Sequence, residues 1–595
     1  MKKVALDLIV FLWFHSAVWA GPFDFYGSAA LPVPLPDLTS WKEAGLDSSA
    51  GQQGFKVFRW DYLKDAPANA QGAMEEDLPT LKVFASPGEY EPVSFCVYAG
   101  NRELKKLTMT CSELKGPGGL IPSNCSDLRV IRRVAVREKE PNTFQLLPVC
   151  LERHTSVEVA PGRAAWVWID LAVPADARPG RYYGTLRIAD GAQTLKEVEI
   201  LLRVLDIKLV PPGKTYGMFV DGSPFSSARG GITCPEKNLV KAFRAHNAFG
   251  FNSTMACGAY PVLSIKNGKL QVDLAELIKF ITIYQEAGLQ GPVTIDVRQI
   301  SWQAEDLGRK LDALNARQEV VSAELATVLR EPKEWDKDYK FSVAGDDLFK
   351  QAIQKILAEG KRRNWPEIMF FPEEELTHGG NKYYGFFHYM KVLHEIPGVR
   401  VVLVDNSTCD GVDLGNKFAH FVDVRAYNFA NDAVVKDARQ AGDLFWLYNY
   451  GWTRASFGLA TWRLAADGNF QWADQWPWDH PYQHLQNKYD SWFIFYPAPD
   501  GVLPSPAGIR IREGMDDMRY IATLEAAIGA AEKNGVSVRK LEQARQVLRE
   551  LHAEIPGEYS AFCEYAGQLT QRQMLVMRWN IARAILMLSG KATKE

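Results

Sequence analysis

Three consecutive glutamates, Glu373, Glu374 and Glu375, follow a short apolar run of β type at residues 368–371. Adjacent carboxylates repel one another, which favours keeping one of them protonated near neutral pH, as a general acid requires. Successive side chains of a strand point to opposite faces, so two of these acids serve one bond only if the backbone leaves strand geometry. Pro372 at the strand exit favours that departure. The pattern predicts an acid pair at the end of a strand.

The same residues allow a second interpretation. A proline followed by three glutamates is also an ordinary first turn of a helix, where the helix dipole and solvent favour acidic side chains. Gly379 and Gly380 argue against a long helix beginning there. The residues by themselves leave catalysis and a helix start equally open.

Polar and aromatic side chains also follow other β-type runs beyond residue 214, where they suit sugar hydroxyls and sugar faces. They are Asp221, Asn252, Asp296, Asp405, Asn406, Tyr427, Asn428, Tyr448 and Asn449, and a loop adds Trp472, Trp476 and Trp478. Taken singly, each such residue is more often structural than functional. We assign substrate binding to Glu373, Asn252, Asp405, Tyr427, Tyr448 and Trp472.

The elements that must position these residues alternate between β-type runs and helical stretches from about residue 214 to residue 510. Such alternation predicts a central (β/α)8 TIM-like barrel, whose active site lies at the carboxyl ends of the strands. Residues 511–595 show apolar residues at helical spacing and predict a carboxyl-terminal helical segment.

The preceding part of the chain has a different pattern. Short β-type runs separated by Gly, Pro and Asp turns fill residues from about 55 to 208 and predict an amino-terminal all-β sandwich domain at 21–210. An apolar strand is expected at 165–173, with Trp166 and Trp168, and Pro211, Pro212 and Gly213 mark a linker. The predicted architecture is therefore multidomain.

Whole-chain properties narrow the classes of function. The chain has 595 residues and a formal net charge of -3, which gives no electrostatic reason to expect nucleic acid as a partner. Its 17 Trp, 22 Tyr and 30 Phe suit a protein that contacts sugar faces. The sequence contains no H-E-x-x-H, P-loop, G-x-S-x-G, or G-x-G-x-x-G after a strand. We therefore expect no metal and no cofactor.

Residues 1–20 resemble a secretory signal peptide, with Lys2 and Lys3 before an apolar run and V-W-A before Gly21. The alternative is an uncleaved membrane anchor. After signal removal we expect no membrane span, and a location in the periplasm, on the cell surface or outside the cell. Eight cysteines show no metal-ligand spacing, and Cys111 with Cys125 is a possible local pair, while free buried thiols are equally compatible. The oligomeric state is not determined by the sequence.

Three segments resemble glycoside hydrolase family 123 and related bacterial secreted proteins. They are E-Y-E-P-V-S-F at 89–95, V-W-I-D-L-A-V-P-A-D-A-R-P-G-R-Y-Y-G-T-L at 167–186 and Y-P-A-P-D-G-V-L-P-S-P-A-G-I-R-I-R-E-G-M-D-D-M-R-Y-I at 496–521. The third is the most specific, because R-E-G-x-x-D-x-x-Y is a distinctive way to end a barrel. Together the segments span nearly the whole mature chain.

The resemblance implies retaining cleavage of β-linked N-acetylgalactosamine, with the substrate's acetamido group as the nucleophile. An Asp-Glu pair after a strand orients that group and protonates the leaving oxygen. Aligning the pair with this sequence sets Glu374 on the Asp and Glu375 on the general acid, and a shift by one residue gives Glu373 and Glu374. Glu in place of Asp moves a carboxylate by about one methylene, which bears on the N-acetyl specificity.

Three hypotheses follow from the residues and the resemblance together. The first is an exo-acting glycoside hydrolase of an oligosaccharide or glycan, with Glu375 as general acid, Glu374 as its partner, and Tyr448 and Trp472 shaping the sugar pocket. The second is a non-catalytic carbohydrate-binding protein with a degenerate acid pair. The third treats the amino-terminal domain as an adhesion or docking module, with the barrel as its scaffold.

Overall fold

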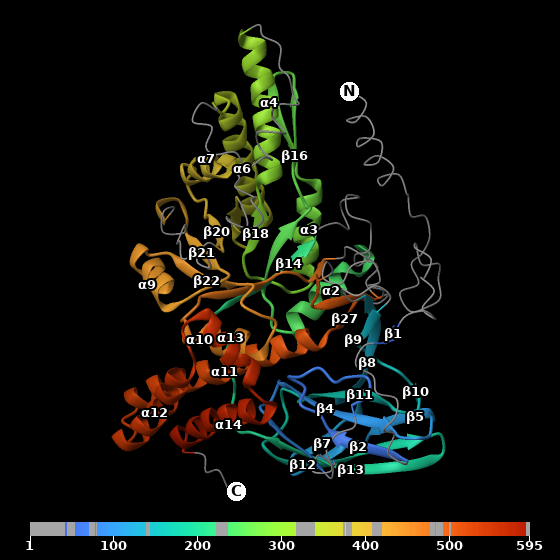
Figure 1. The fold of residues 1–595 in the computed structure, drawn as a ribbon. Coiled ribbons are helices and arrows are strands. Elements are labelled where there is room, and N and C mark those ends of the chain that lie inside the picture. Colours follow the sequence, from blue (N-terminus) through green and yellow to red (C-terminus); the bar gives the residue numbers. More distant parts are fainter. Residues whose placement is uncertain are drawn as a thin grey trace.

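The computed structural model describes residues 42–43, 54–70, 78, 80–137, 143–221, 236–316, 340–372, 375, 384–406, 419–476, 482, 492–498 and 501–590. The predicted signal peptide, Glu373, Glu374 and Trp478 lie outside these residues. Within them the chain forms an amino-terminal region of mixed β-sheets, a nearly closed barrel of parallel strands and a set of carboxyl-terminal helices (Figure 1). These three parts agree with the multidomain organisation predicted from the sequence.

Two sheets make up the amino-terminal region. One has the order β1 (Lys42–Glu43), β9 (Thr143–Glu152), β8 (Ser126–Arg137), β11 (Arg163–Ala172), β4 (Tyr90–Ala99) and β2 (Phe55–Arg59). The other has the order β10 (Val157–Val159), β5 (Leu104–Cys111), β12 (Gly180–Asp190), β13 (Gln193–Val204) and β3 (Thr80–Ala85), with β6 (Leu114–Gly116) and β7 (Gly119–Ile121) beside β12. Side chains of both sheets meet in one apolar cluster, so the sheets share a core.

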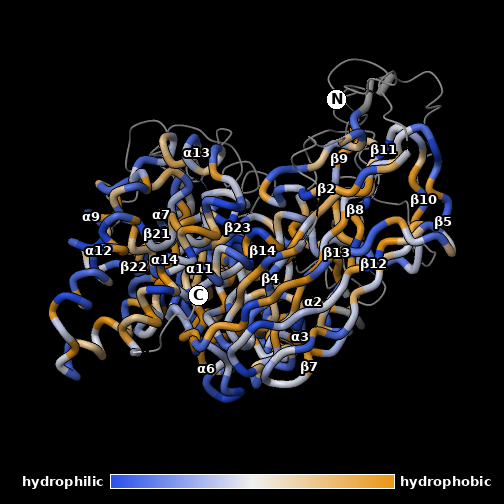
Figure 2. Tube along the Cα trace, turned by 90° about the horizontal axis from the view of Figure 1, so that it is seen from below, coloured by the Kyte–Doolittle hydropathy of each residue, from blue (hydrophilic) through white to orange (hydrophobic). Residues whose placement is uncertain are grey.

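Strand β11 is buried on both faces, which explains its nearly continuous apolar sequence. Val167 and Ile169 contribute to the cluster shared by the two sheets. Trp166 and Trp168 point the other way and join a cluster that includes Ile509 of the carboxyl-terminal part. Figure 2 shows hydrophobic residues along strands such as β4 and β8 and hydrophilic stretches toward the periphery. The alternation of β11 thus connects the amino-terminal region to the rest of the chain.

Eight parallel strands follow one another around the barrel in chain order. They are β14 (Thr215–Asp221), β15 (Ser253–Cys257), β18 (Val293–Asp296), β19 (Ile368–Phe371), β20 (Val402–Asp405), β21 (Val424–Tyr427), β22 (Leu444–Tyr448) and β23 (Gly468–Gln471). Strand β23 pairs with β14, and β19 meets β20 at one bridge, Phe370 with Val401. The sheet is therefore nearly closed, and all its strands end on the same side of the molecule.

Helices return the chain between most of these strands. They are α2 (Glu236–Ala248), α3 (Ala275–Glu286), α4 (Arg298–Ala316), α6 (Val343–Arg363), α7 (Tyr384–His394), α9 (Asp432–Ala441) and α10 (Thr461–Arg463), with short helical turns η6 (Ala419–Phe421) and η7 (Ser456–Ala460). A hairpin of β16 (Val262–Lys266) and β17 (Lys269–Asp273) follows β15. After β23 come β24 (Gln475–Trp476), β25 (Trp492–Phe493), β26 (Phe495–Ala498) and β27 (Gly501–Pro504).

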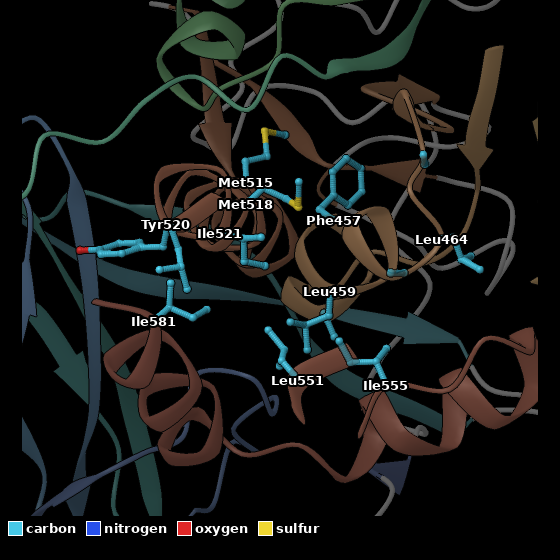
Figure 3. Close-up of a cluster of buried hydrophobic side chains, with 14 of the residues drawn as sticks. Phe457, Leu459, Leu464, Met515, Met518, Tyr520, Ile521, Leu551, Ile555 and Ile581 are labelled. Atoms are coloured by element: carbon cyan, nitrogen blue, oxygen red, sulfur yellow. The ribbon is translucent and has the colours of Figure 1, made fainter. Parts of the chain in front are cut away.

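The carboxyl-terminal helices are α11 (Pro506–Lys533), α12 (Val538–Glu554), α13 (Tyr559–Gln568) and α14 (Gln571–Leu588). Ser505 caps α11 by accepting from the Gly508 N–H at 3.1 Å, and Pro506 occupies the first turn. Figure 3 shows side chains of α11, α12 and α14 packed against Phe457 and Leu459 of η7, beneath the barrel. The hydroxyl of Tyr520 points away from this apolar cluster.

A buried ionic cluster lies where α11 and α14 meet strand β4. Arg578 of α14 donates from Nε to Asp517 at 2.6 Å and from Nη1 to Glu89 at 3.1 Å and Glu91 at 3.0 Å. Its Nη2 donates to the Glu513 carboxylate at 3.1 Å and to the Glu513 carbonyl at 2.9 Å. All five side chains are almost completely buried. One guanidinium thus connects three segments that are far apart in the chain.

A second guanidinium, that of Arg454, holds the loop before η7 in the same cluster. It binds both oxygens of Asp517 at 2.7 Å and also bonds to the Tyr62 hydroxyl. Burial raises the pKa of Glu89 to about 8, and burial also raises the pKa of Glu91 well above its usual value. Burial acts the same way on Asp517, but the charges of Arg454 and Arg578 outweigh it and lower that pKa.

The three segments that carry the family resemblance therefore meet at this junction. Tyr520, the last residue of R-E-G-x-x-D-x-x-Y, donates to Glu89 of E-Y-E-P at 2.8 Å. Arg512 binds both oxygens of Asp170, in V-W-I-D, at 2.6 Å. Gly514 packs so closely on the loop before η7 that an added Cβ would lie 2.4 Å from the Arg454 carbonyl oxygen. The most specific motif of the sequence thus holds the amino-terminal region, the barrel and the helices together.

Cys111 and Cys125, the possible local pair, are both free thiols in the structure. Burial raises the pKa of Cys111 to about 12. Among the residues that the structure covers, no helix is both long enough and apolar enough to cross a membrane.

Candidate active site

The carboxyl ends of the barrel strands carry the candidate site. Their interior side chains form an apolar cluster that includes Phe219, Phe371, Trp446, Tyr448 and Phe470. The barrel is therefore filled rather than open, and chemistry is confined to the residues that follow the strands.

Glu375 follows β19 and has a φ of 49°, in the left-handed region. That backbone conformation is incompatible with an α-helical turn, and the next described helix, α7, begins at Tyr384. For Glu375, the interpretation as a helix start is therefore wrong. Its backbone departs from strand geometry, as the prediction of an acid pair requires, and its side chain is half-buried.

The Glu375 carboxylate reaches across the barrel mouth to two asparagine amides. Its Oε1 accepts from Asn428 Nδ2 at 2.5 Å and, more weakly, from Asn449 Nδ2 at 3.5 Å. Asn428 directly follows β21 and Asn449 directly follows β22. Residues after three strands thus converge on one carboxylate oxygen.

The second of these amides is fixed by its own hydrogen bonds. Asn449 has a φ of 49°, and its Oδ1 accepts from the Trp472 N–H at 2.8 Å and from Gln471 Nε2 at 2.9 Å. Because the oxygen takes two donors, the amide nitrogen must point the other way, toward Glu375. Asparagine tolerates this left-handed backbone better than most residues. The end of β23 therefore orients the Glu375 site through Asn449.

Aromatic rings line the adjacent part of the mouth around Phe219 of β14. The Phe219 ring centroid lies 5.4 Å from Tyr448 and 5.0 Å from Trp472, at interplanar angles of 50° and 55°. Tyr448 is fully buried, whereas Trp472 is half-buried. Tyr448 thus supports the floor, and Trp472 is the ring available to a ligand.

A cation lies beside the strand that leads to Glu375. Arg298, the first residue of α4, binds both oxygens of the buried Asp296 carboxylate, at 2.6 Å from Nη2 and 3.0 Å from Nε. Tyr260 also donates to Asp296, at 3.2 Å. The Arg298 guanidinium lies 5.9 Å from the Phe371 ring centroid. Asp296 is therefore an anchor that holds Arg298 at the mouth.

Asn252 is a correction to the predicted site. It precedes the first residue of β15, so it lies at the amino end of the barrel, opposite the mouth. Its Oδ1 accepts from the Tyr216 N–H at 2.9 Å, and its Nδ2 donates to the Lys214 carbonyl at 2.9 Å. The sequence pattern placed Asn252 near a strand but did not show at which end, and its amide is used to fix the backbone.

Tyr427 is a second correction. It pairs in register with Leu447, so it shares the helix-facing side of the sheet, while Tyr448 faces the interior. The Tyr427 ring lies 6.0 Å from Phe445, and its hydroxyl pairs with Arg425. Asp405 is a third correction. It is fully buried and pairs in register with Tyr427, so strand alternation sets it on the same helix-facing side, away from the barrel mouth.

The sequence offered one signal for the two asparagines. The dipeptide Tyr-Asn occurs at the ends of both β21 and β22, at 427–428 and 448–449. Asn428 and Asn449 were recognised as strand-end groups, but substrate binding was assigned to the tyrosines. Gln471 and Arg298 were not predicted, and no local pattern marks either of them.

Comparisons with known proteins give one match to the amino-terminal region and one to most of the chain. Residues 67–190 match the glycoside hydrolase 123 N-terminal domain. A family 123 glycoside hydrolase from Clostridium perfringens, solved to study glycolipid glycan hydrolysis, is similar over 90% of this chain and 100% of that chain, with a TM-score of 0.64 and 12% identity. The resemblance to glycoside hydrolase family 123 is confirmed. The sequence match to family 123 covers β3 to β12, and at 12% identity the likeness of the barrel to the Clostridium perfringens protein is one of fold.

Two other solved glycoside hydrolases are similar to this chain at a lower level. A family 39 glycoside hydrolase from Bacteroides cellulosilyticus has a TM-score of 0.32 at 11% identity, covering 73% of this chain and 81% of that one. A GH5 xyloglucanase from Bacteroides ovatus has a TM-score of 0.30 at 11% identity, covering 75% and 99%. Scores this low carry no argument about function. No curated protein sequence gives a significant match.

Proposed function

We propose that this protein is a glycoside hydrolase and that Glu375 is its general acid, with Glu374 as its partner and Glu373 as a substrate-binding residue. The observation that carries the proposal is the Glu375 carboxylate, which the amides of Asn428 and Asn449 hold at the barrel mouth. A general acid must be held within reach of the leaving oxygen, and this network supplies that positioning.

The same proposal includes a finer description of the architecture and of the substrate. The two amino-terminal sheets, which share one apolar cluster, would form a β-sandwich, and the eight parallel strands with their helices would form a (β/α)8 barrel. The sequence resemblance to family 123 favours a β-linked N-acetylgalactosaminide as substrate and the acetamido group of that substrate as the nucleophile. The Clostridium perfringens neighbour suggests the glycan of a glycolipid as one source of such a sugar.

Hydrolysis of aryl N-acetyl-β-galactosaminide, together with a panel of other aryl glycosides, tests the assignment. On a substrate that the wild type cleaves, Glu375→Gln should lower kcat by about 10²-fold to 10⁴-fold, the usual contribution of a general acid. Glu367→Gln is the matched control, because Glu367 lies at the opposite end of β19 in an exposed pair with Arg400. If Glu375→Gln matches the wild type, the role proposed for Glu375 is wrong.

A second candidate is a non-catalytic carbohydrate-binding protein. It is favoured by the glutamate that replaces the aspartate of the family pair. Binding on a glycan array without turnover of any aryl glycoside would support it, and turnover of any glycoside would exclude it. Glycan binding retained by residues 21–210 alone would instead support the adhesion hypothesis.

We also propose that the chain is exported to the periplasm, the cell surface or the medium, from the basic start and apolar run of residues 1–20. Amino-terminal sequencing of the protein from its native host should give Gly21 as the first residue. A mature chain that still begins at Met1 would support the membrane-anchor alternative.

A further inference from the structure

A groove of about 1010 Å³ lies between the amino-terminal region and helix α14, away from the barrel mouth. One wall is the outer face of strands β3, β12 and β13, and Figure 1 shows α14 beside these strands. The other wall is a stripe on α14 formed by Arg572, Val576 and Trp579, spaced by one and two helical turns. Val576 is 51% exposed and Trp579 is half-buried, so the fold covers this stripe only in part.

The groove is strongly cationic. Arg59, Lys82, Arg181, Arg203 and Arg572 all line it. The Arg203 guanidinium lies over the Trp579 ring, 5.0 Å from its centroid. No salt bridge joins Lys82, Arg181 or Arg572 to a carboxylate in the part of the chain that the structure describes.

Among the residues that the structure describes, Asp61 is the one acid that lines this groove, and it bonds to backbone groups. Its Oδ2 accepts from the Gln571 N–H at the start of α14 at 2.9 Å, and its Oδ1 accepts from the Leu63 N–H at 2.9 Å. The Asp61 carboxylate thus fixes two backbone segments. The groove keeps an excess of positive charge.

The register of the strands brings these basic side chains close together. Arg181 of β12 lies directly opposite Arg203 of β13, and on the other side β13 pairs Arg203 with Phe84 and Leu201 with Lys82. Like charges directly opposite each other on one sheet face are destabilising. A ligand that carries repeated negative charges would relieve this repulsion across three neighbouring strands.

We propose that this groove binds an acidic polysaccharide, through carboxylate or sulfate groups on the basic side chains and sugar faces on the Val576 and Trp579 wall. The formal net charge of -3 disfavours a nucleic acid as the occupant, and the exposed apolar stripe of α14 suits sugar faces. The proposal is independent of Glu375 and adds a substrate-holding surface to the chain.

Binding of the full-length protein to heparin, polygalacturonate and neutral dextran, measured by affinity electrophoresis at low salt, tests the proposal. Lys82→Gln/Arg181→Gln should weaken polyanion binding by about tenfold, because it removes two exposed ion pairs. Lys266→Gln/Lys269→Gln is the matched control, since these exposed lysines face each other on the β16–β17 hairpin and change the net charge equally. Turnover of a small aryl glycoside should be unchanged in both variants.

The experiment separates the outcomes. The proposal is supported if heparin or polygalacturonate, but not dextran, retains the protein and only Lys82→Gln/Arg181→Gln loses this binding. The stronger of the two polyanions then shows whether sulfate or carboxylate is preferred. Absence of polyanion binding, or an equal loss in the hairpin control, would overturn it. Equally tight binding of single-stranded DNA by the same residues would replace the glycan with a nucleic acid.

Discussion

Replacing Arg578 with methionine removes the guanidinium that joins α14 to strand β4 and helix α11, while keeping most of the volume of the side chain. Four carboxylates, those of Glu89, Glu91, Glu513 and Asp517, accept hydrogen bonds from Arg578, and all are buried. After the substitution only Arg454 of the two central guanidiniums remains. Breaking a buried pair by removing one partner typically costs about 3–5 kcal/mol, because the other charge stays buried without compensation.

We therefore expect Arg578→Met to lower the free energy of unfolding of the junction by at least about 3 kcal/mol. Urea unfolding followed by tryptophan fluorescence measures it, since Trp166 and Trp168 belong to the cluster beside this junction. Arg583→Met is the matched control: it lies on the same helix but is exposed, so we expect a change below about 1 kcal/mol.

A rescue variant keeps the test decisive if Arg578→Met does not fold. Glu91 Oε2 bonds to Arg578, and Glu91 Oε1 has no hydrogen-bond partner in the described chain. Arg578→Met/Glu91→Gln should therefore recover part of the lost stability, because an amide is neutral in this buried cluster without having to take up a proton. Stability of Arg578→Met within about 1 kcal/mol of the wild type would refute the argument that this cluster holds the three parts together.

Three further variants probe the junction and the site. The pKa of Glu91 is higher in the folded state than in the unfolded state. The contribution of Glu91 to stability is therefore present below pH about 4.5 and is lost as the pH rises toward the folded pKa. The thermal midpoint of Glu91→Gln should exceed that of the wild type at pH 8 and match it near pH 4.5. Gly514→Ala should destabilise by about 1–3 kcal/mol through the clash with the Arg454 carbonyl, which thermal unfolding measures, and an unchanged midpoint would contradict that packing. Asn449→Gly keeps the left-handed backbone but removes the amide from Glu375 and the acceptor from the Trp472 N–H, so kcat should fall by about tenfold and stability by about 1 kcal/mol. A kcat equal to that of the wild type would count against the positioning role.

Local patterns were sufficient for much of the fold. The apolar run of β11, the alternation of strands and helices beyond residue 214 and the helical spacing after residue 510 all depend on neighbours in the sequence, and the structure agrees with them. The departure of the backbone at Glu375 was also predictable, because Pro372 ends the strand. The continuous apolar sequence of β11 indicates burial on both faces.

The site assignments that were wrong had suitable residue types, but the side chains lie at the wrong end of a strand or on the wrong face of the sheet. Asn252 lies at the wrong end of its strand, and Tyr427 lies on the wrong face, since a shift of one residue in register reverses the side chain. The motif R-E-G-x-x-D-x-x-Y was recognised as distinctive, but its place in a junction with Glu89 could not be inferred from spacing.

The sequence by itself determined the order of the three parts, the acidic strand end at Glu375 and the resemblance to family 123, because these depend on short-range pattern. Only the tertiary structure decided that Asn428 and Asn449 meet Glu375, that the family motif joins the parts, and that basic residues of three strands share a groove with α14. Each of these depends on strand register and on helix packing between distant segments, and no local pattern encodes them.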